Sequence, residues 1–177
     1  MNQRSWPPDA VMKLLVGDPR FEQVPADGDY ARVVAAQLVR EECDLALYSA
    51  MKGRWTKANT LTYDAARKAV EALLLSVGWR VRAVAGAHAG VSEVVHAWLG
   101  TQPPPGPRMA DKFAASRKAR HDDEYPHPAA THRTDAELRA LAQDNVRIVN
   151  LVRAELALPA RPELVPTDEN VAAFRRV

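Results

Sequence analysis

Residues 63–74 read YDAARKAVEALL, and this stretch decides the fold. Apolar side chains recur through it every three or four residues, as they do along one side of a helix. The stripe extends from about residue 61 to 77, and alanines widen it until only a narrow polar strip remains, formed by Asp64, Arg67, Lys68 and Glu71. A helix that is apolar around most of its circumference must be covered on several sides. We therefore expect the central helix of a bundle, ended by Gly78.

Further helical patterns lie on both sides of this stretch. Residues 91–99 and 108–125 have helical character, and Thr134 with Glu137 forms a capping box that starts a helix to about residue 157. No segment alternates with period two for long enough to predict a sheet. An amphipathic helix is expected over residues 29–51, where these side chains repeat at helical spacing: Tyr30, Val33, Val34, Leu38, Leu45, Leu47, Tyr48 and Met51.

The expected fold class is all-α, with four to six helices in an up-and-down bundle over residues 29–157. Residues 1–28 are expected to form a lead with one short helix, because an apolar patch lies between Pro7-Pro8 and Gly17-Asp18-Pro19. Residues 158–177 carry prolines and alternating charges, which is typical of a loose tail. A chain of 177 residues can hold one domain with a sizeable core but not two ordinary ones.

Charge and cysteine content exclude several classes of protein. The formal net charge of +2 is too small for general nucleic-acid binding, so any site for a polyanion must be local. A single cysteine, Cys43, excludes an internal disulfide and a thiolate metal cluster. No secretion signal and no run of about 18 apolar residues is visible, so we expect a cytoplasmic protein with no membrane segment.

Residues 116–127 read SRKARHDDEYPH and concentrate ionisable groups. Five of them fall at helical spacing on one face, while Asp122 and Asp123 point elsewhere. Two guanidinium groups, an imidazole, a carboxylate and a phenol on one face are sufficient to bind, and to process, a phosphodiester. The ordinary interpretation is a solvated helix end with ion pairs. The five residues are Arg117, Arg120, His121, Glu124 and Tyr125.

The helix order, together with three segments of sequence, resembles the HEPN family, whose name abbreviates higher eukaryotes and prokaryotes nucleotide-binding. The segments are residues 63–74, the AHAGV turn at 87–91 after Gly78, and RKARHDDEY at 117–125. The resemblance covers residues 29–157. It implies a HEPN-like helical bundle, commonly dimeric, in which the arginine-bearing helices of two chains meet to form a cleft. Many members are metal-independent endoribonucleases, including toxins of toxin–antitoxin systems, and others are non-catalytic.

The family motif is an arginine, a polar residue, a few further residues and then a histidine. Arg120 and His121 match the first two positions, but Tyr125 stands where the family histidine is most often found. His127 lies within a looser spacing, with Pro126 between it and the helix. These departures leave open whether the protein is an enzyme.

The resemblance implies a role for each residue of this motif. Arg120 would stabilise charge on a phosphate, and His121 or His127 would be the acid–base group. Tyr125 would orient a phosphate or donate a proton, since a phenol is a poor base at neutral pH. Arg117 and Glu124 would contribute to ligand binding.

We therefore expect a homodimer that acts on RNA or a nucleotide ligand in a bacterial defence, toxin or stress setting. The alternative is a non-catalytic dimerisation or docking module, with a nucleotidyltransferase-type protein as one partner. A metal site is a third interpretation, because histidines and acids crowd the end of the 108–125 helix. The segment lacks a standard ligand spacing such as His-Glu-x-x-His, so we expect no metal and no cofactor.

Overall fold

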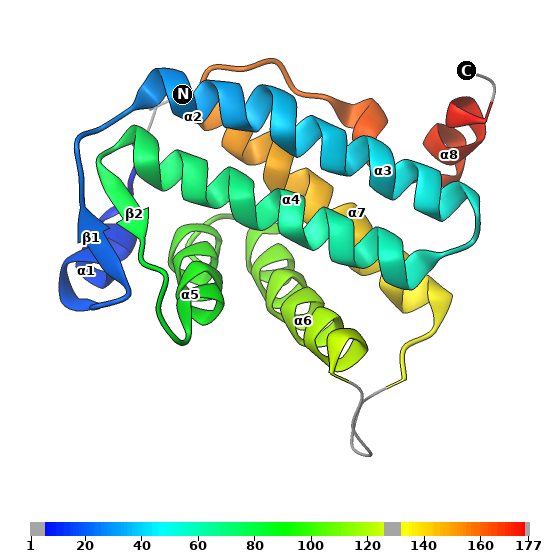
Figure 1. Ribbon diagram of the computed structural model, residues 1–177, viewed down its shortest axis with the longest axis horizontal. Coiled ribbons are helices and arrows are strands. Elements are labelled where there is room, and N and C mark those ends of the chain that lie inside the picture. The colour runs from blue at the N-terminus through cyan, green and yellow to red at the C-terminus, as the bar shows by residue number, and fades with distance from the viewer. Residues whose placement is uncertain (1–5, 126–131, 176–177) are drawn as a thin grey trace.

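The computed structural model describes residues 6–125 and 132–175. Helices dominate these residues, which confirms the expected all-α class (Figure 1). Five helical segments form the bundle: α2–η1–α3 (Gly28–Val33, Val34–Leu38 and Val39–Met51), α4 (Trp55–Ser76), α5 (Ala87–Leu99), α6 (Gly106–Glu124) and α7 (Asp135–Glu155). Smaller elements complete the described chain: α1 (Asp9–Gly17), β1 (Phe21–Gln23), β2 (Trp79–Val81), η2 (Pro162–Leu164) and α8 (Asp168–Phe174).

The predicted central helix is α4, which packs against α3, α6 and α7. It starts at Trp55 rather than near residue 61, and Trp55 is itself buried. It ends before Gly78, whose φ of +82° is disfavoured for any residue with a side chain. A Cβ atom at Gly78 would also lie 2.9 Å from the Val24 carbonyl oxygen. The predicted glycine stop is therefore confirmed.

The helices do not all alternate in direction. α3 runs antiparallel to α4, and α5 and α6 lie side by side beneath α4, inclined to it (Figure 1). α7 runs in the same direction as α4, because Arg139 lies over the Trp55 ring and Asn145 donates a hydrogen bond to Thr62 further along both helices. The capping box that we predicted at Thr134 starts α7.

The helix predicted over residues 29–51 is present and contains one π turn, η1. Val39 N–H bonds the Val34 carbonyl, five residues earlier, and the Arg153 guanidinium of α7 donates to the Ala35 carbonyl at 2.8 Å. The side of this helix that faces the bundle carries mostly small residues, and several large apolar side chains face outward. The buried residues include Ala31, Ala35, Val39, Cys43, Leu47 and Ala50.

A two-stranded sheet, which the sequence pattern did not predict, lies at one end of the bundle. β1 and β2 pair antiparallel, with Glu22 opposite Arg80. Three residues per strand are too few to produce a recognisable alternation. The end segments also contribute to the core, since Val11, Leu15 and Val171 are buried. None of the described helices is long and apolar enough to span a membrane.

A buried polar cluster fixes α4, α6 and α7 relative to one another. Ser116 of α6 donates to the Asn59 side chain of α4 at 3.1 Å. Asn145 of α7 donates to Ser116 at 3.0 Å and to Thr62 at 3.3 Å. All four side chains are fully buried, where a lost partner would leave an unsatisfied polar group. This cluster holds α6 in the orientation that presents Arg117 and Arg120.

Candidate functional site

An open cleft of about 640 Å³ lies between α6 and α5. It is lined by the C-terminal half of α6, the loop after β2 and the first turn of α5. The five α6 residues predicted to share one face all line it. The prediction that Asp122 points elsewhere agrees with its burial, and Arg133 reaches it at 3.4 Å. The cleft-lining side chains are Arg117, Arg120, His121, Glu124 and Tyr125 from α6, with His88 from α5.

Arg120 is held in place by carboxylates on two helices. Its Nε atom lies 3.5 Å from Asp64 Oδ2 on α4, and its Nη2 atom lies 2.9 Å from Glu124 Oε1 one turn along α6. The guanidinium also lies over the Tyr63 ring, 6.0 Å from its centroid. The Arg120 side chain is only 21% exposed, so these partners fix its orientation.

The polar strip of α4 supports the cleft from below. Arg67 forms ion pairs with Asp64 at 3.6 Å and with Glu71 at 2.7 Å. This is the strip that the sequence pattern left outside the apolar stripe. Asp64 of this strip faces Arg120 of α6, whereas Lys68 forms an ion pair with Glu42 of α3. The pattern gave no indication of either partner, because helix periodicity does not say which neighbour covers a given side.

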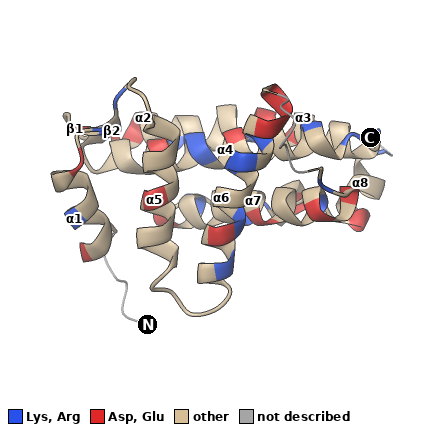
Figure 2. Cartoon of the chain, turned by 90° about the horizontal axis from the view of Figure 1, so that it is seen from below, with Lys and Arg blue, Asp and Glu red and all other residues tan. Residues whose placement is uncertain are grey.

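Arg117 is the exposed arginine of the cleft. It forms no ion pair with any residue in 6–125 or 132–175, unlike Arg120 and Arg67. Three arginines and three carboxylates (Asp64, Glu71 and Glu124) therefore meet here, but the charge of Arg117 stays available. In the view of Figure 2, basic and acidic residues are interspersed along the described helices.

His88 is a cleft residue that was not among the site residues predicted from the sequence. Partial burial lowers its pKa below the ordinary value of 6.5, and the nearby positive charges of Arg67 and Arg120 lower it further. The imidazole is therefore neutral at pH 7 and can accept a proton. Only its place in the AHAGV turn of residues 87–91 drew attention to it in the sequence.

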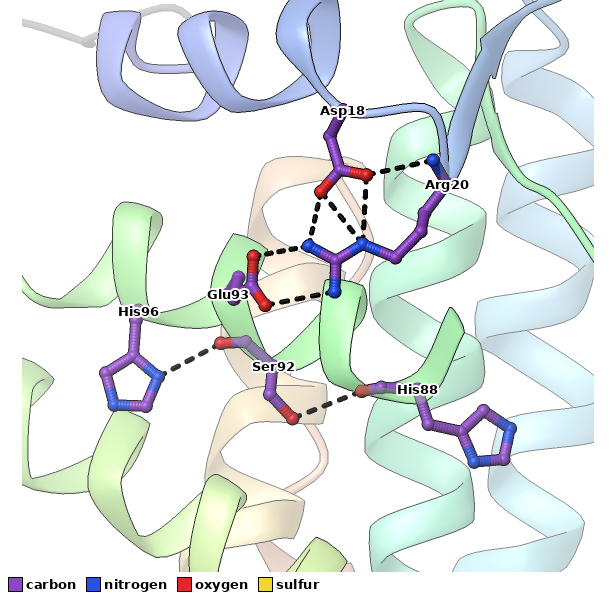
Figure 3. A network of polar contacts seen from close by, with 6 residues as sticks. All are labelled: Asp18, Arg20, His88, Ser92, Glu93 and His96. Carbon is purple, nitrogen blue, oxygen red and sulfur yellow. Dashed lines mark hydrogen bonds and ion pairs between the residues drawn. The ribbon is translucent and has the colours of Figure 1, made fainter. Parts of the chain in front are cut away.

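The position of His88 depends on contacts made by Arg20. The Arg20 guanidinium bonds both Asp18 and Glu93, and so connects the turn after α1 to α5 (Figure 3). The His88 imidazole points away from this network, while its carbonyl accepts a bond from Ser92 Oγ at 3.3 Å (Figure 3). Gly90 allows the close approach, because a Cβ there would lie 3.2 Å from the Phe21 ring.

His121 and Tyr125 lie side by side at the outer end of the cleft, with ring centroids 5.2 Å apart. Tyr125 is 64% exposed, so a ligand can reach its hydroxyl. His127, the other predicted acid–base candidate, lies outside the described residues. The structure thus brings together five of the six predicted site residues and adds His88.

Tyr63 lies beneath the cleft, with its ring against Phe113 and the Arg120 guanidinium. Its hydroxyl is buried and has no hydrogen-bond partner among the residues that the structure describes. Burial raises the pKa of this phenol to about 12. Tyr63 is therefore a neutral support for Arg120 and not an acid–base group.

No group of three or more His, Cys, Asp or Glu side chains is placed to hold a metal ion in residues 6–125 and 132–175. Cys43 is fully buried, and burial raises the pKa of its thiol to about 12, which makes it an inert core residue. The chemical groups that line the cleft are the side chains of Arg117, Arg120, His88, His121, Tyr125 and Glu124.

No family model, no curated protein and no solved structure matches this chain.

Proposed function

We propose that the cleft binds a phosphate group of RNA or of a nucleotide, and that the chain, which resembles HEPN proteins, works as a homodimer in a bacterial defence, toxin or stress setting in the cytoplasm. The observation that carries the proposal is the exposed Arg117, which has no carboxylate partner in the described chain. It lies one helical turn from Arg120 in the same cleft. Guanidinium groups bind phosphate oxygens through paired N–H donors.

The ion pairs of Arg120 indicate how a phosphate would enter. Of its two carboxylate partners, the Glu124 side chain is 41% exposed and the Asp64 side chain 19%. A phosphate would therefore displace Glu124, while Asp64 keeps the guanidinium oriented from below. Glu124 competes with the ligand, so its removal should strengthen binding.

The catalytic form of the proposal is metal-independent cleavage of RNA. Neutral His88 takes the proton of a ribose 2′-hydroxyl, and the 2′-oxygen bonds to phosphorus while the bond to the 5′-oxygen breaks. His121, when protonated, supplies the proton to the leaving oxygen. Arg120 and Arg117 stabilise the negative charge that builds on the phosphate oxygens.

Binding is tested with a fluorescently labelled single-stranded RNA and the purified full chain, by anisotropy at several salt concentrations. Replacing Arg117 by alanine should weaken binding roughly 3- to 10-fold, because one phosphate contact is lost. Lys118→Ala is the matched control, since Lys118 is also exposed on α6 but does not line the cleft. Equal effects of the two substitutions would contradict a site at this position.

Cleavage is tested separately in the presence of EDTA. The wild-type chain should cut RNA, while Arg120→Ala and His88→Asn should reduce the rate by at least 100-fold. If the chain binds RNA through Arg117 but does not cut it, the binding proposal stands and the catalytic form is wrong.

A second candidate function is a non-catalytic dimerisation or docking module, with a nucleotidyltransferase-type protein among the partners that the resemblance implies. It is favoured by the large apolar side chains that α2–η1–α3 exposes. Expression in bacteria separates the two candidates. A ribonuclease should arrest growth and Arg120→Ala should relieve the arrest, whereas a docking module should be tolerated in both forms.

A further inference from the structure

The segment α2–η1–α3 exposes five large apolar side chains that no part of the described chain covers. They are between 48% and 55% exposed, although a helix in a bundle normally turns such residues inward. We call them the apolar strip: Tyr30, Val33, Leu38, Leu45 and Tyr48. The strip is about 27 Å long at 1.5 Å per residue. Exposed apolar patches of this kind mark interaction sites more often than chance surface residues do.

The strip is not a consequence of poor packing, because the opposite side of the same helix is closely packed. Ala31, Ala35 and Val39 are fully buried there, against an alanine-rich face of α4. The helix thus has one side of small residues that lets α4 approach, and an outward side on which the large apolar residues are interspersed with the exposed Arg32, Gln37, Arg40 and Glu41. The outward side continues into a groove against α4 that Tyr30, Val34 and Leu38 line.

The order of residues in the strip is symmetric about position 39. Tyr30 and Tyr48 each lie nine residues from it, Val33 and Leu45 each lie six residues from it, and Leu38 is adjacent to it. When two copies of this helix pack antiparallel about a two-fold axis that passes near position 39, Tyr30 faces Tyr48 of the partner subunit. Val33 then faces the partner's Leu45. Self-complementarity of this kind is the requirement for an isologous interface.

The charges at the two ends of the strip are complementary in the same arrangement. Asp29 lies beside Tyr30 at the start of the helix, and Lys52 lies over the Tyr48 ring, 5.6 Å from its centroid, at the other end. Antiparallel pairing about position 39 places Asp29 opposite Ser49 of the partner subunit, within one helical turn of the partner's Lys52. It also sets the helix dipoles in opposite directions, which is favourable.

We propose that the apolar strip is a homodimer interface in which two copies of α2–η1–α3 pack antiparallel. The occupant is a second copy of this chain. The proposal concerns assembly only and does not depend on the ligand of the α6 cleft. It differs from the arrangement that the HEPN resemblance implies, in which the arginine-bearing helices of two chains meet.

Sedimentation analysis of the full chain tests the assembly. The wild type should have twice the mass of one chain, and Leu38→Glu with Leu45→Glu should reduce it to a monomer with unchanged helical circular dichroism. Val16→Glu is the matched control, because Val16 is 72% exposed on α1, outside the strip, and should leave the dimer intact. A monomeric wild type at 100 μM would overturn the proposal, and so would loss of the dimer in Arg117→Glu but not in the double variant.

Engineered disulfides test the antiparallel direction. The native Cys43 is fully buried, so it should not form interchain bonds. Tyr30→Cys together with Tyr48→Cys should give covalent dimers on mild oxidation, whereas each single variant should not, because its two cysteines lie at opposite ends of the interface. Cross-linking by Tyr30→Cys alone would show a parallel arrangement and overturn the proposal.

Discussion

Arg120 of α6 reaches Asp64 of α4, with its Nε atom 3.5 Å from Asp64 Oδ2. The same carboxylate lies 3.6 Å from Arg67, so Asp64 is shared by two guanidinium groups that are both mostly buried. One carboxylate therefore holds the base of the cleft together.

Replacing Asp64 by alanine should destabilise the fold by about 2 kcal/mol, because it leaves two partly buried arginines without this partner. Unfolding in urea measures the loss. The control is Asp111→Ala, since the Asp111 side chain is 76% exposed and its contact with His96 at 3.2 Å should contribute little. Equal stability of the two variants would mean that Asp64 is not structurally important.

Low pH should weaken the ion pairs of Arg20 that join the turn after α1 to α5. Hydrogen bonds from the Arg20 side chain lower the pKa of Asp18 below its ordinary value of 3.8. A carboxylate with a lowered pKa in the folded state stabilises the fold above its ordinary pKa, and this contribution is lost as the pH falls through the lowered value. Asp18→Asn should therefore be less stable than the wild type at pH 6, and the difference should shrink below about pH 4. Unfolding free energies across this pH range check the sign, and a constant difference would contradict it.

The turn that ends α4 should require glycine. Gly78→Ala should cost roughly 1–3 kcal/mol, because it combines a positive φ with a close contact to the Val24 carbonyl oxygen. Gly17→Ala is the matched control, since a Cβ at Gly17 meets nothing within 4 Å. Thermal unfolding of both variants measures the difference, and the prediction is wrong if both alanines are tolerated.

The pKa of His88 should report on the arginines of the cleft. In an NMR titration its imidazole should lose its proton below the ordinary pKa of 6.5, because of partial burial and the charges of Arg67 and Arg120. Arg120→Ala should raise this pKa towards the ordinary value, since one positive charge is removed. Arg32→Ala, at an exposed position on α2, should leave it unchanged. If the pKa of His88 does not change in Arg120→Ala, the proposal that His88 acts as the general base of the cleft is wrong.

Periodicity predicted most of the helices and the shared face of α6, because both follow from spacing within one segment. Thr134 even fixed the start of α7 through local hydrogen bonds. The position of His88 could not be predicted in the same way. It depends on the β1–β2 pairing and on Arg20, which contacts Glu93 over a long separation in sequence.

The sequence pattern also marked Tyr30, Leu38 and Leu45 as the apolar side of their helix, but the structure buries its small residues instead. Spacing alone cannot distinguish two apolar stripes on one helix. The stripe of small residues allows a closer approach to the alanines of α4, and this close approach decides which side turns inward. The sequence predicted α4 correctly. Comparing the sizes of the side chains on α4 and on residues 29–51 would therefore have indicated which side of the second helix is buried.

The π turn at Val34–Leu38 holds one residue more than an α-helical turn of the same segment would. Deleting a single residue there would restore regular α-helical geometry and leave the two flanking halves in their present relative orientation. Winding the same residues as a regular α-helix would instead rotate everything before it by about 100° relative to α3. Tyr30 and Val33 would then swing out of line with Leu45 and Tyr48, and Arg153 would lose the Ala35 carbonyl as its acceptor. The wide winding of this short segment thus aligns the two halves of a surface that would otherwise point in different directions.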